Sequence, residues 1–149
     1  LSVHAKAVIC VQLAGWRCDR ESIMDLAEQE GLFVIEDCAQ AHGAFYKGRP
    51  VGSIGHIGAW SFCQDKIMTT GGEGGMVTTN DPELWSKMWS YKDHGKSWDA
   101  VYNGRHKPVF PCLHDSFDST YRKARRAARL NGNQLEWVPA RHQQPSRNA

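Results

Sequence analysis

The strongest constraint on the fold is a strand, helix and strand pattern near the start of the chain. Lys6–Leu13 (KAVICVQL) is a mostly apolar run rich in β-branched residues, which predicts a strand buried on both faces in a parallel sheet. A helix is expected next, with Asp19 as its N-cap and Gly31 just after its end, and Leu32–Ile35 then predicts a second buried strand. Such a unit requires a right-handed crossover between parallel strands, so we expect an α/β fold.

Later segments extend this pattern with shorter elements. Gln40–Gly58 is rich in glycine and predicts a loop with a short hairpin, and Ile57–Phe62 and Met76–Thr79 predict two further strands. Asp81–Tyr91 opens with an N-cap aspartate and a proline and predicts a helix. Asp93–Asp115 shows no period and predicts a long loop that carries aromatic residues. The inner face of the helix is expected to consist of Leu84, Trp85, Met88 and Trp89.

Composition excludes several classes of protein. With 149 residues, of which 41% are hydrophobic and 23% charged, the chain has the make-up of a globular protein rather than a disordered one. No apolar run approaches the roughly 18 residues that a membrane span needs, so we expect a soluble protein. The five cysteines form no CxxC pair and the seven histidines are scattered, which predicts reduced thiols, a cytoplasmic location and no metal centre. Because residue 1 is Leu and a strand follows at once, we expect the sequence to begin within a longer polypeptide.

Charge is distributed unevenly along the chain. Residues 1–103 carry 9 Lys and Arg against 13 Asp and Glu, and residues 104–149 carry 9 against 3, which gives net charges of −4 and +6. The second segment contains a predicted basic helix, Ser119–Leu130, and one hypothesis is that it binds nucleic acid by neutralising phosphates. We favour an enzymatic function, because the basic run has no signature of a nucleic-acid-binding fold and the first hundred residues are acidic. The basic residues concerned are Lys123, Arg125, Arg126 and Arg129.

Three features that are weak singly suggest a cofactor site in combination. Asp37 follows a predicted buried strand, Lys66 lies in a loop after a later strand, and the glycine-rich Thr69–Gly75 comes next. Alone, Asp37 is more often a structural acceptor and Lys66 a solvated surface residue, and no P-loop or GxGxxG motif is present. Pyridoxal phosphate, however, requires a lysine for its Schiff base and a carboxylate for its pyridine nitrogen, and ligands of α/β sheets bind beyond the carboxyl ends of strands. Ser61 offers a hydroxyl for the phosphate.

Three motifs carry a family resemblance: Val34–Ala44 (VIEDCAQAHGA), Gly48–Gly52 (GRPVG) and Gly58–Asp81 (GAWSFCQDKIMTTGGEGGMVTTND). In these motifs the sequence resembles the DegT/StrS family of sugar aminotransferases, which are pyridoxal 5'-phosphate enzymes of the aspartate aminotransferase fold, fold type I. The resemblance implies a three-layer α/β/α architecture in which residues 1–114 are the central part of the large, cofactor-binding domain. Residues 115–149 would form a divergent basic segment that leads toward a small domain outside the chain.

The resemblance implies a role for each of four residues. Lys66 matches the family's Schiff-base lysine, which also moves a proton between substrate and cofactor carbons, and Asp37 matches the carboxylate on the pyridine nitrogen. Gln40 matches a residue beside the ring and its phenolic oxygen, and Ser61 matches a phosphate ligand. His42 either lies near the cofactor or has a structural role in its loop, and the sequence leaves both open.

The same resemblance implies a reaction. An amino group would move from an amino acid, glutamate in our expectation, to a ketone of a nucleotide-linked sugar during amino sugar biosynthesis. The expected assembly is a homodimer in which the partner subunit contributes to each site, so a fragment could be inactive by itself. The alternative hypothesis is a catalytically inert homologue or a truncated product.

The sequence departs from the family pattern at three places. His56 stands where an acidic residue is common, and Arg17 where a proline is common. Across Asp118–Asn133, Thr120 replaces an asparagine that in the family reaches the cofactor phosphate of the partner subunit, and a basic helix replaces an apolar one. This stretch is either a genuine divergence or the product of two compensating frameshifts, since enrichment in Arg and Ala is typical of a shifted frame in GC-rich DNA.

Overall fold

The structure is a computed structural model that describes residues 4–13 and 19–103. These residues belong to two compact units, which we describe separately: residues 4–13 and 19–80 are part of unit 1, and residues 81–103 are part of unit 2. Several predictions fall outside the described residues. They concern Arg17, the domain boundary after residue 114, Asp118–Asn133 with Thr120, the helix at Ser119–Leu130, and the basic residues Lys123, Arg125, Arg126 and Arg129.

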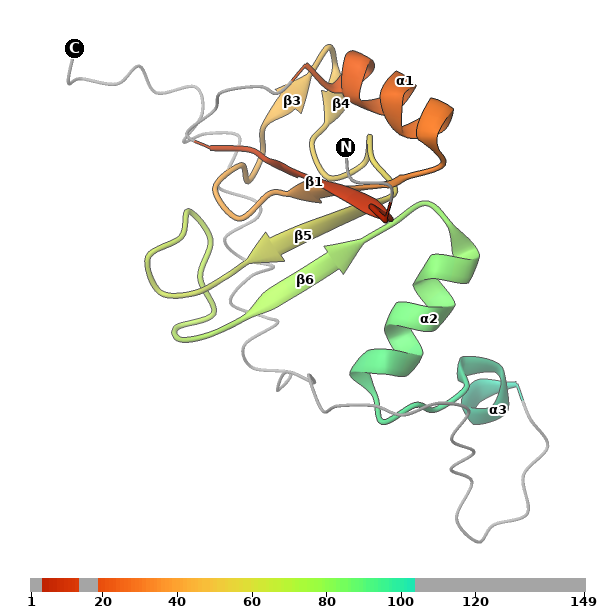
Figure 1. The fold of residues 1–149 in the computed structure, drawn as a ribbon. Coiled ribbons are helices and arrows are strands. Elements are labelled where there is room, and N and C mark those ends of the chain that lie inside the picture. Colours follow the sequence, from red (N-terminus) through yellow and green to blue (C-terminus); the bar gives the residue numbers. More distant parts are fainter. Residues whose placement is uncertain (1–3, 14–18, 104–149) are drawn as a thin grey trace, which may run out of the picture. The chain divides into compact units, whose positions relative to one another are not determined.

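Unit 1 is built on a mixed four-stranded sheet (Figure 1). Its strands are β1 (Ala7–Val11), β2 (Phe33–Asp37), β5 (Ile57–Ser61) and β6 (Gly75–Thr78), in the spatial order β1-β2-β5-β6. The first three are parallel, as the strand, helix and strand pattern predicts, and β6 is antiparallel to β5. This direction is possible because residues 62–74 join β5 to β6 as a loop without a crossover helix.

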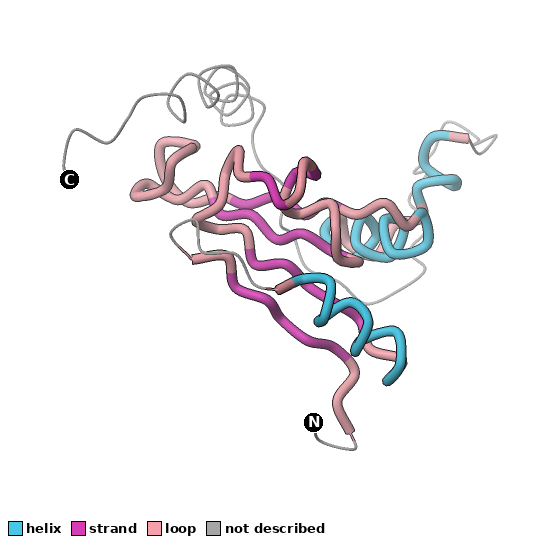
Figure 2. The backbone as a smooth tube through the Cα atoms, turned by 90° about the horizontal axis from the view of Figure 1, so that it is seen from above, coloured by secondary structure: helices cyan, strands magenta, loops and turns pink. Residues whose placement is uncertain are grey.

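Helix α1 (Arg20–Glu30) precedes β2 and lies along the sheet (Figure 2). It begins where the Asp19 side chain accepts a hydrogen bond from the Ser22 backbone N–H (3.4 Å). It ends at Gly31, whose φ of 62° is a left-handed conformation that glycine adopts readily. Both ends confirm the sequence prediction. The helix packs on the sheet through a cluster of buried side chains: Cys10, Ala27, Leu32 and Val34.

The two faces of the unit 1 sheet differ in their cover. On the face that α1 packs against, Cys10 and Val34 are buried. On the opposite face, Ile9, Val11 and Phe33 are 65%, 52% and 47% exposed. Successive side chains of a strand point to opposite faces of the sheet. The sequence predicts strands buried on both faces, and the described residues of unit 1 cover one of these faces.

The connection between β2 and β5 contains the predicted short hairpin. β3 (Phe45–Tyr46) and β4 (Arg49–Pro50) pair in antiparallel fashion. Lys47 and Gly48 form the turn, with φ angles of 47° and 79°. Two consecutive positive φ angles match the twist of a tight hairpin, which explains the glycine at the second position.

Unit 2 begins with helix α2 (Pro82–Lys92). Asp81 is its N-cap, as predicted, and its side chain accepts hydrogen bonds from the backbone N–H groups of Glu83 (2.7 Å) and Leu84 (3.0 Å). The proline at the first helical position has no N–H to leave unpaired. The predicted inner face is covered only in part, since no residue of α2 is fully buried and Trp85 is 41% exposed.

A second helix in unit 2, α3 (Trp98–Tyr102), shows that the prediction of a continuous loop over Asp93–Asp115 was wrong at this point. Ser97 caps the helix by accepting a hydrogen bond from the Ala100 backbone N–H (3.4 Å). Five residues are too few to display a helical period, so the sequence pattern could not reveal it.

Aromatic rings join α2 to α3 within unit 2. The ring centroid of Trp98 lies 5.1 Å from that of Trp85, 5.0 Å from that of Trp89 and 4.1 Å from that of Tyr102. The contacts with Trp85 and Trp89 are edge-to-face, a favourable arrangement for aromatic rings. The helices of the described residues are α1, α2 and α3, and none of them is long and apolar enough to cross a membrane.

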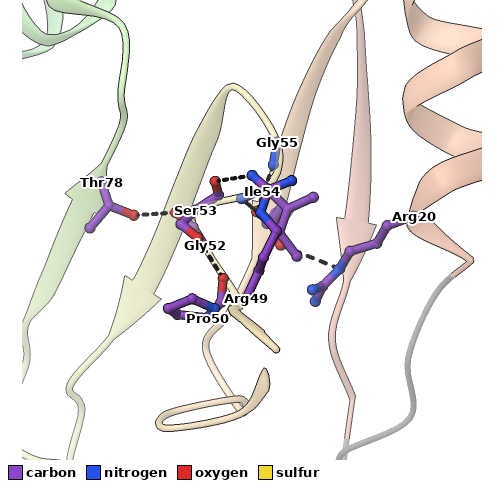
Figure 3. A network of polar contacts seen from close by, with 9 residues as sticks. Arg20, Arg49, Pro50, Gly52, Ser53, Ile54, Gly55 and Thr78 are labelled. Carbon is purple, nitrogen blue, oxygen red and sulfur yellow. Dashed lines mark hydrogen bonds and ion pairs between the residues drawn. The ribbon is translucent and has the colours of Figure 1, made fainter. Parts of the chain in front are cut away.

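A buried ion pair links α1, β2 and the loop after β4 (Figure 3). Glu36 is 1% exposed, and its Oε1 accepts hydrogen bonds from the backbone N–H groups of Ile54 (2.9 Å) and Gly55 (2.8 Å). Its Oε2 lies 3.4 Å from Nε of Arg20, which is 3% exposed and whose guanidinium lies 5.1 Å from the Tyr46 ring centroid. Because buried charges are costly unless they are paired, this contact fixes three segments against one another.

The same loop extends the polar network toward β6 (Figure 3). The Ser53 hydroxyl donates to the Pro50 carbonyl (2.7 Å), and the Thr78 hydroxyl donates to the Gly52 carbonyl (2.8 Å). Gly52 has a φ of 76°, and a Cβ added there would lie 2.5 Å from Cζ2 of Trp60. The loop therefore needs glycine where it crosses β5.

Replacing Glu36 by alanine is expected to lower the free energy of unfolding by about 3 kcal/mol, because the Arg20 charge would stay buried without its partner. Urea unfolding of the complete gene product that contains this chain measures the change. The control is Glu21→Ala, which breaks an ion pair between Glu21 and Lys47 whose side chains are 63% and 60% exposed, and such pairs contribute little. Equal unfolding midpoints for the two variants would contradict the stabilising role of the buried pair.

Candidate active site

Residues that the resemblance singles out lie at one edge of the unit 1 sheet. β2 and β5 are adjacent parallel strands, so their carboxyl ends meet at the same edge, where Asp37 ends β2 and Ser61 ends β5. Asp37 is paired with Ala59, and Ser61 lies two residues further along β5, on the same face. The loop from Cys63 to Gly74, which carries Lys66, projects beyond this edge (Figure 1).

The Asp37 carboxylate faces away from α1. Successive strand residues point to opposite faces, and Glu36 points toward α1. Oδ1 of Asp37 accepts a hydrogen bond from the Ala39 backbone N–H (3.0 Å), and its backbone carbonyl accepts one from Gln12 N–H (2.9 Å). Its Oδ2 has no hydrogen-bond partner among the described residues. The side chain is thus held in one orientation with an acceptor atom available to a ligand.

Gln40 occupies the turn that follows β2. The turn is closed by a hydrogen bond from the Ala41 backbone N–H to the Cys38 carbonyl (3.0 Å). Gln40 is exposed, so its amide is free of the core and accessible beside the strand end.

Lys66 lies in a loop whose two ends are tied together. Its backbone N–H donates to the Cys63 carbonyl (3.2 Å), and its side chain is 17% exposed, with Nζ 3.9 Å from Oδ1 of Asp65. We call residues Cys63–Gly74 the lysine loop. At its base, the backbone N–H and the hydroxyl of Thr70 both donate to the Phe62 carbonyl, at 3.0 and 3.2 Å. These bonds hold a largely covered lysine amine close to the end of β5.

The residues around the lysine loop have distinct tasks. The Ser61 hydroxyl accepts a long hydrogen bond from the Cys63 backbone N–H (3.4 Å), which leaves its own proton to donate. Within Thr69–Gly75, Gly71 has a φ of 72°, a left-handed conformation that glycine adopts readily. Gly75 permits strand pairing, because a Cβ there would lie 2.8 Å from the Trp60 carbonyl oxygen.

His42 joins the segment after Asp37 to strand β5. Its side chain is 2% exposed, and its ring centroid lies 5.4 Å from Trp60 and 5.6 Å from Phe62. Burial lowers the pKa of the imidazole below its ordinary value, the nearby Ser61 backbone opposes this shift, and the charge of Lys66 adds to it. The ring is therefore neutral at pH 7.

The Cys38 thiol at this edge offers no competing nucleophile. Burial, with a smaller contribution from the Glu36 charge, raises the pKa of the Cys38 thiol to about 12, so Cys38 is not a nucleophile at neutral pH. Within residues 4–13 and 19–103, no three His, Cys, Asp or Glu side chains gather in a way that could hold a metal ion. The edge presents an amine, a carboxylate, an amide and a hydroxyl.

The structure brings the four predicted site residues, Asp37, Gln40, Ser61 and Lys66, to the ends of two adjacent strands and the loops that follow them. The sequence analysis did not single out Thr70, which closes the lysine loop. In the sequence, Thr70 is visible only as a threonine just before a glycine pair. Its partner Phe62 is eight residues away, so the contact is seen only in the folded loop.

The fold and the edge define an α/β protein with a candidate ligand site beyond the carboxyl ends of parallel strands. The chain belongs to the DegT/DnrJ/EryC1/StrS aminotransferase family, whose sequence profile matches residues 2–134. The resemblance read from the motifs is therefore confirmed.

Two relatives have names that refer to nucleotide-linked sugars. GDP-perosamine synthase from Escherichia coli O157:H7 is 42% identical over 131 residues, which are 88% of this chain and 33% of that protein. A UDP-N-acetyl-3-dehydro-alpha-D-glucosamine 3-aminotransferase from Acidithiobacillus ferrooxidans is 46% identical over 103 residues, or 69% of this chain and 28% of that protein. The chain spans about a third of the length of such relatives.

A solved structure supports the same assignment. An aminotransferase from Psychrobacter cryohalolentis is 63% identical, superimposes with a TM-score of 0.91, and is matched over 94% of this chain and 35% of that one. This similarity confirms the predicted α/β fold class, that of the large domain of fold type I pyridoxal phosphate enzymes.

Stability is expected to fall as the pH decreases below about 6.5, because His42 binds a proton more readily in the unfolded chain than in the folded protein. Between the unfolded and folded pKa values, the loss approaches about 1.4 kcal/mol per pH unit. Urea unfolding at several pH values, for the wild-type protein and for His42→Phe, measures it. The difference between the two proteins isolates His42, and parallel pH profiles would show that His42 is not the group responsible.

Proposed function

We propose that the protein is a pyridoxal-phosphate-dependent sugar aminotransferase. The observation that supports this most directly is the position of Asp37 and of the Lys66 loop beyond the carboxyl ends of adjacent parallel strands, in a chain of this family. In this proposal residues 1–114 are the central part of a larger cofactor-binding domain, and residues 115–149 lead toward a small domain. The protein acts as a homodimer in the cytoplasm.

The residues at this edge fit the chemistry of the cofactor. A protonated pyridine nitrogen needs an anionic acceptor, and Asp37 has Oδ1 fixed by Ala39 and Oδ2 available. The cofactor phosphate needs donors, and the Ser61 hydroxyl has a proton to give. The cofactor aldehyde needs an amine, which Lys66 supplies from a tied loop.

Each of the four side chains has one task in the proposed reaction. When bound, pyridoxal phosphate supplies an electron sink for the negative charge that develops on the carbon next to the transferred amine. Nζ of Lys66 would hold the cofactor covalently and would carry a proton between the reacting carbons. The Asp37 carboxylate would accept the pyridine N–H and keep that nitrogen protonated. The Ser61 hydroxyl would donate to the phosphate, and the Gln40 amide would lie beside the ring and its phenolic oxygen.

The amino acceptor in this proposal is a nucleotide-linked keto-sugar, and the donor is an amino acid, with glutamate as our expectation. Support comes from two relatives, one named as a GDP-perosamine synthase and the other as a 3-aminotransferase of a UDP-linked sugar. Because the two names carry different nucleotides, we propose the class of substrate and no single sugar.

Sodium borohydride is expected to trap pyridoxal phosphate covalently on Lys66 when the complete gene product is incubated with the cofactor, because borohydride reduces the bond between the lysine nitrogen and the cofactor carbon. Peptide mass spectrometry locates the adduct. Lys66→Ala should lose it, whereas Lys47→Ala, which removes a lysine with a 60% exposed side chain, should keep it. An adduct that persists in Lys66→Ala contradicts the assignment, and a wild-type protein that binds no cofactor points to an inert homologue.

Asp37→Asn is expected to lower kcat for amino transfer from glutamate by about 100-fold, because an amide cannot hold the proton on the pyridine nitrogen as a carboxylate does. Folding should be retained, since the amide oxygen can still accept the Ala39 N–H. Asp25→Asn, on the exposed side of α1, is the matched control and should leave kcat unchanged. A wild-type kcat for Asp37→Asn would place the essential carboxylate elsewhere.

A further inference from the structure

The lysine loop is hydrogen-bonded to itself at its base. The backbone N–H of Phe62 donates to the Gly74 carbonyl (2.6 Å), which continues the pairing of β5 with β6 by one residue. The Phe62 carbonyl accepts the backbone N–H of Thr70 (3.0 Å). Residues 63–69, with Lys66 at their centre, therefore form a closed segment whose two ends meet where Phe62 and Thr70 are bonded.

The Thr70 hydroxyl adds a side-chain contact to this base. Its Oγ1 lies 3.2 Å from the Phe62 carbonyl oxygen and 3.1 Å from the Glu73 carbonyl oxygen, so the hydroxyl proton can be donated to either. Phe62 belongs to the side of the loop that leaves β5, and Glu73 to the glycine-rich side that leads into β6. Thr70 is 8% exposed, so its hydroxyl joins the two sides of the loop in a place that is largely covered from water.

The contribution of the hydroxyl can be separated from that of the backbone. Any residue other than proline would supply the N–H at position 70 that bonds the Phe62 carbonyl. The contact with Glu73 depends on the side chain alone. Valine has the shape of threonine but no hydroxyl proton, so valine would keep the backbone bond and lose the side-chain bond.

Two contacts connect this base to Lys66. The Lys66 backbone N–H donates to the Cys63 carbonyl (3.2 Å), which forms a turn directly after Phe62. On the other side of the lysine, Met68 is 4% exposed and packs with Phe62 in a buried cluster. The lysine backbone is thus held between a turn and a buried side chain, and both adjoin the residue that Thr70 bonds.

We propose that Thr70 is a positioning residue, whose hydroxyl fixes the base of the lysine loop and thereby places Nζ of Lys66 for bonding to the cofactor. This inference rests on the proposed function, because pyridoxal phosphate is the group that the amine would hold. Thr70 acts through Lys66 and needs no contact of its own with cofactor or substrate. Its effect is preorganisation, since an amine on a fixed loop loses less conformational freedom when it is bound.

Two substitutions at position 70 separate the hydroxyl from the shape of the side chain. Thr70→Val keeps the branched shape and removes the donor, whereas Thr70→Ser keeps the hydroxyl and removes a methyl group. The matched control is Thr79→Val. It removes the hydrogen bond from the Thr79 hydroxyl to the His56 carbonyl (2.7 Å), at the opposite end of β5 and β6.

The first measurement is the dissociation constant of pyridoxal phosphate for each variant of the complete gene product. Thr70→Val should weaken binding about tenfold, the change expected for one lost hydrogen bond, and Thr70→Ser should recover most of it. Thr79→Val should bind as the wild type does. If Thr70→Val also binds as the wild type does, or if Thr70→Ser is as weak as Thr70→Val, the proposal is wrong.

The second measurement is amide hydrogen exchange of the cofactor-free proteins. In Thr70→Val the exchange of residues 63–74 should accelerate, while β1 and β2 should keep the wild-type rates. An unchanged loop contradicts the proposal, and acceleration throughout unit 1 indicates a general structural role and overturns it. This measurement needs no cofactor, so if the wild-type protein binds no pyridoxal phosphate, the proposed function fails while hydrogen exchange still decides whether Thr70 fixes the loop.

Discussion

The alternation of side chains along β2 is the constraint on which the rest of unit 1 depends. Because of this alternation, the neighbouring acidic residues Glu36 and Asp37 at the end of the strand point to opposite faces of the sheet. Glu36 is buried with Arg20 and two backbone N–H groups, and this pairing makes its charge tolerable. Asp37 faces the other way with one carboxylate oxygen available. One anion therefore anchors the strand end, and the next one is held ready for a ligand.

Fixing the end of β2 matters because the candidate site is assembled from loops. Gln40 and His42 follow β2, and Lys66 follows β5, so their relative positions depend on the strand ends and on the contacts between the loops. Thr70 closes the lysine loop upon itself, and the His42 ring packs against Phe62 at the base of that loop. These contacts limit the movement of the loops relative to the sheet.

The parts of this arrangement that the sequence could predict are those with local causes. Asp19 and Gly31 mark the ends of α1 because caps act within a turn of the helix, and the motif around Lys66 is contiguous. The direction of β6, the short helix α3 and the Arg20–Glu36 pair depend on contacts between segments or on elements too short to show a period. His42 remained open between two roles for the same reason, since its partners lie on another strand.

The buried polar contacts of the sheet add little net stability to the fold. Their main effect is to disfavour other registers of the strands. A single hydrogen bond contributes about 1 kcal/mol net, but a buried polar group left without a partner costs up to about 3 kcal/mol. Glu36 and His56 illustrate this, because Glu36 accepts from the backbone N–H groups of Ile54 and Gly55, and His56 accepts from the Val34 N–H. A shift of β5 along β2 would separate both side chains from these partners at once. The register that places Asp37 beside Ala59, and hence beside the end that carries Ser61, is therefore favoured over its neighbours by the sum of these penalties.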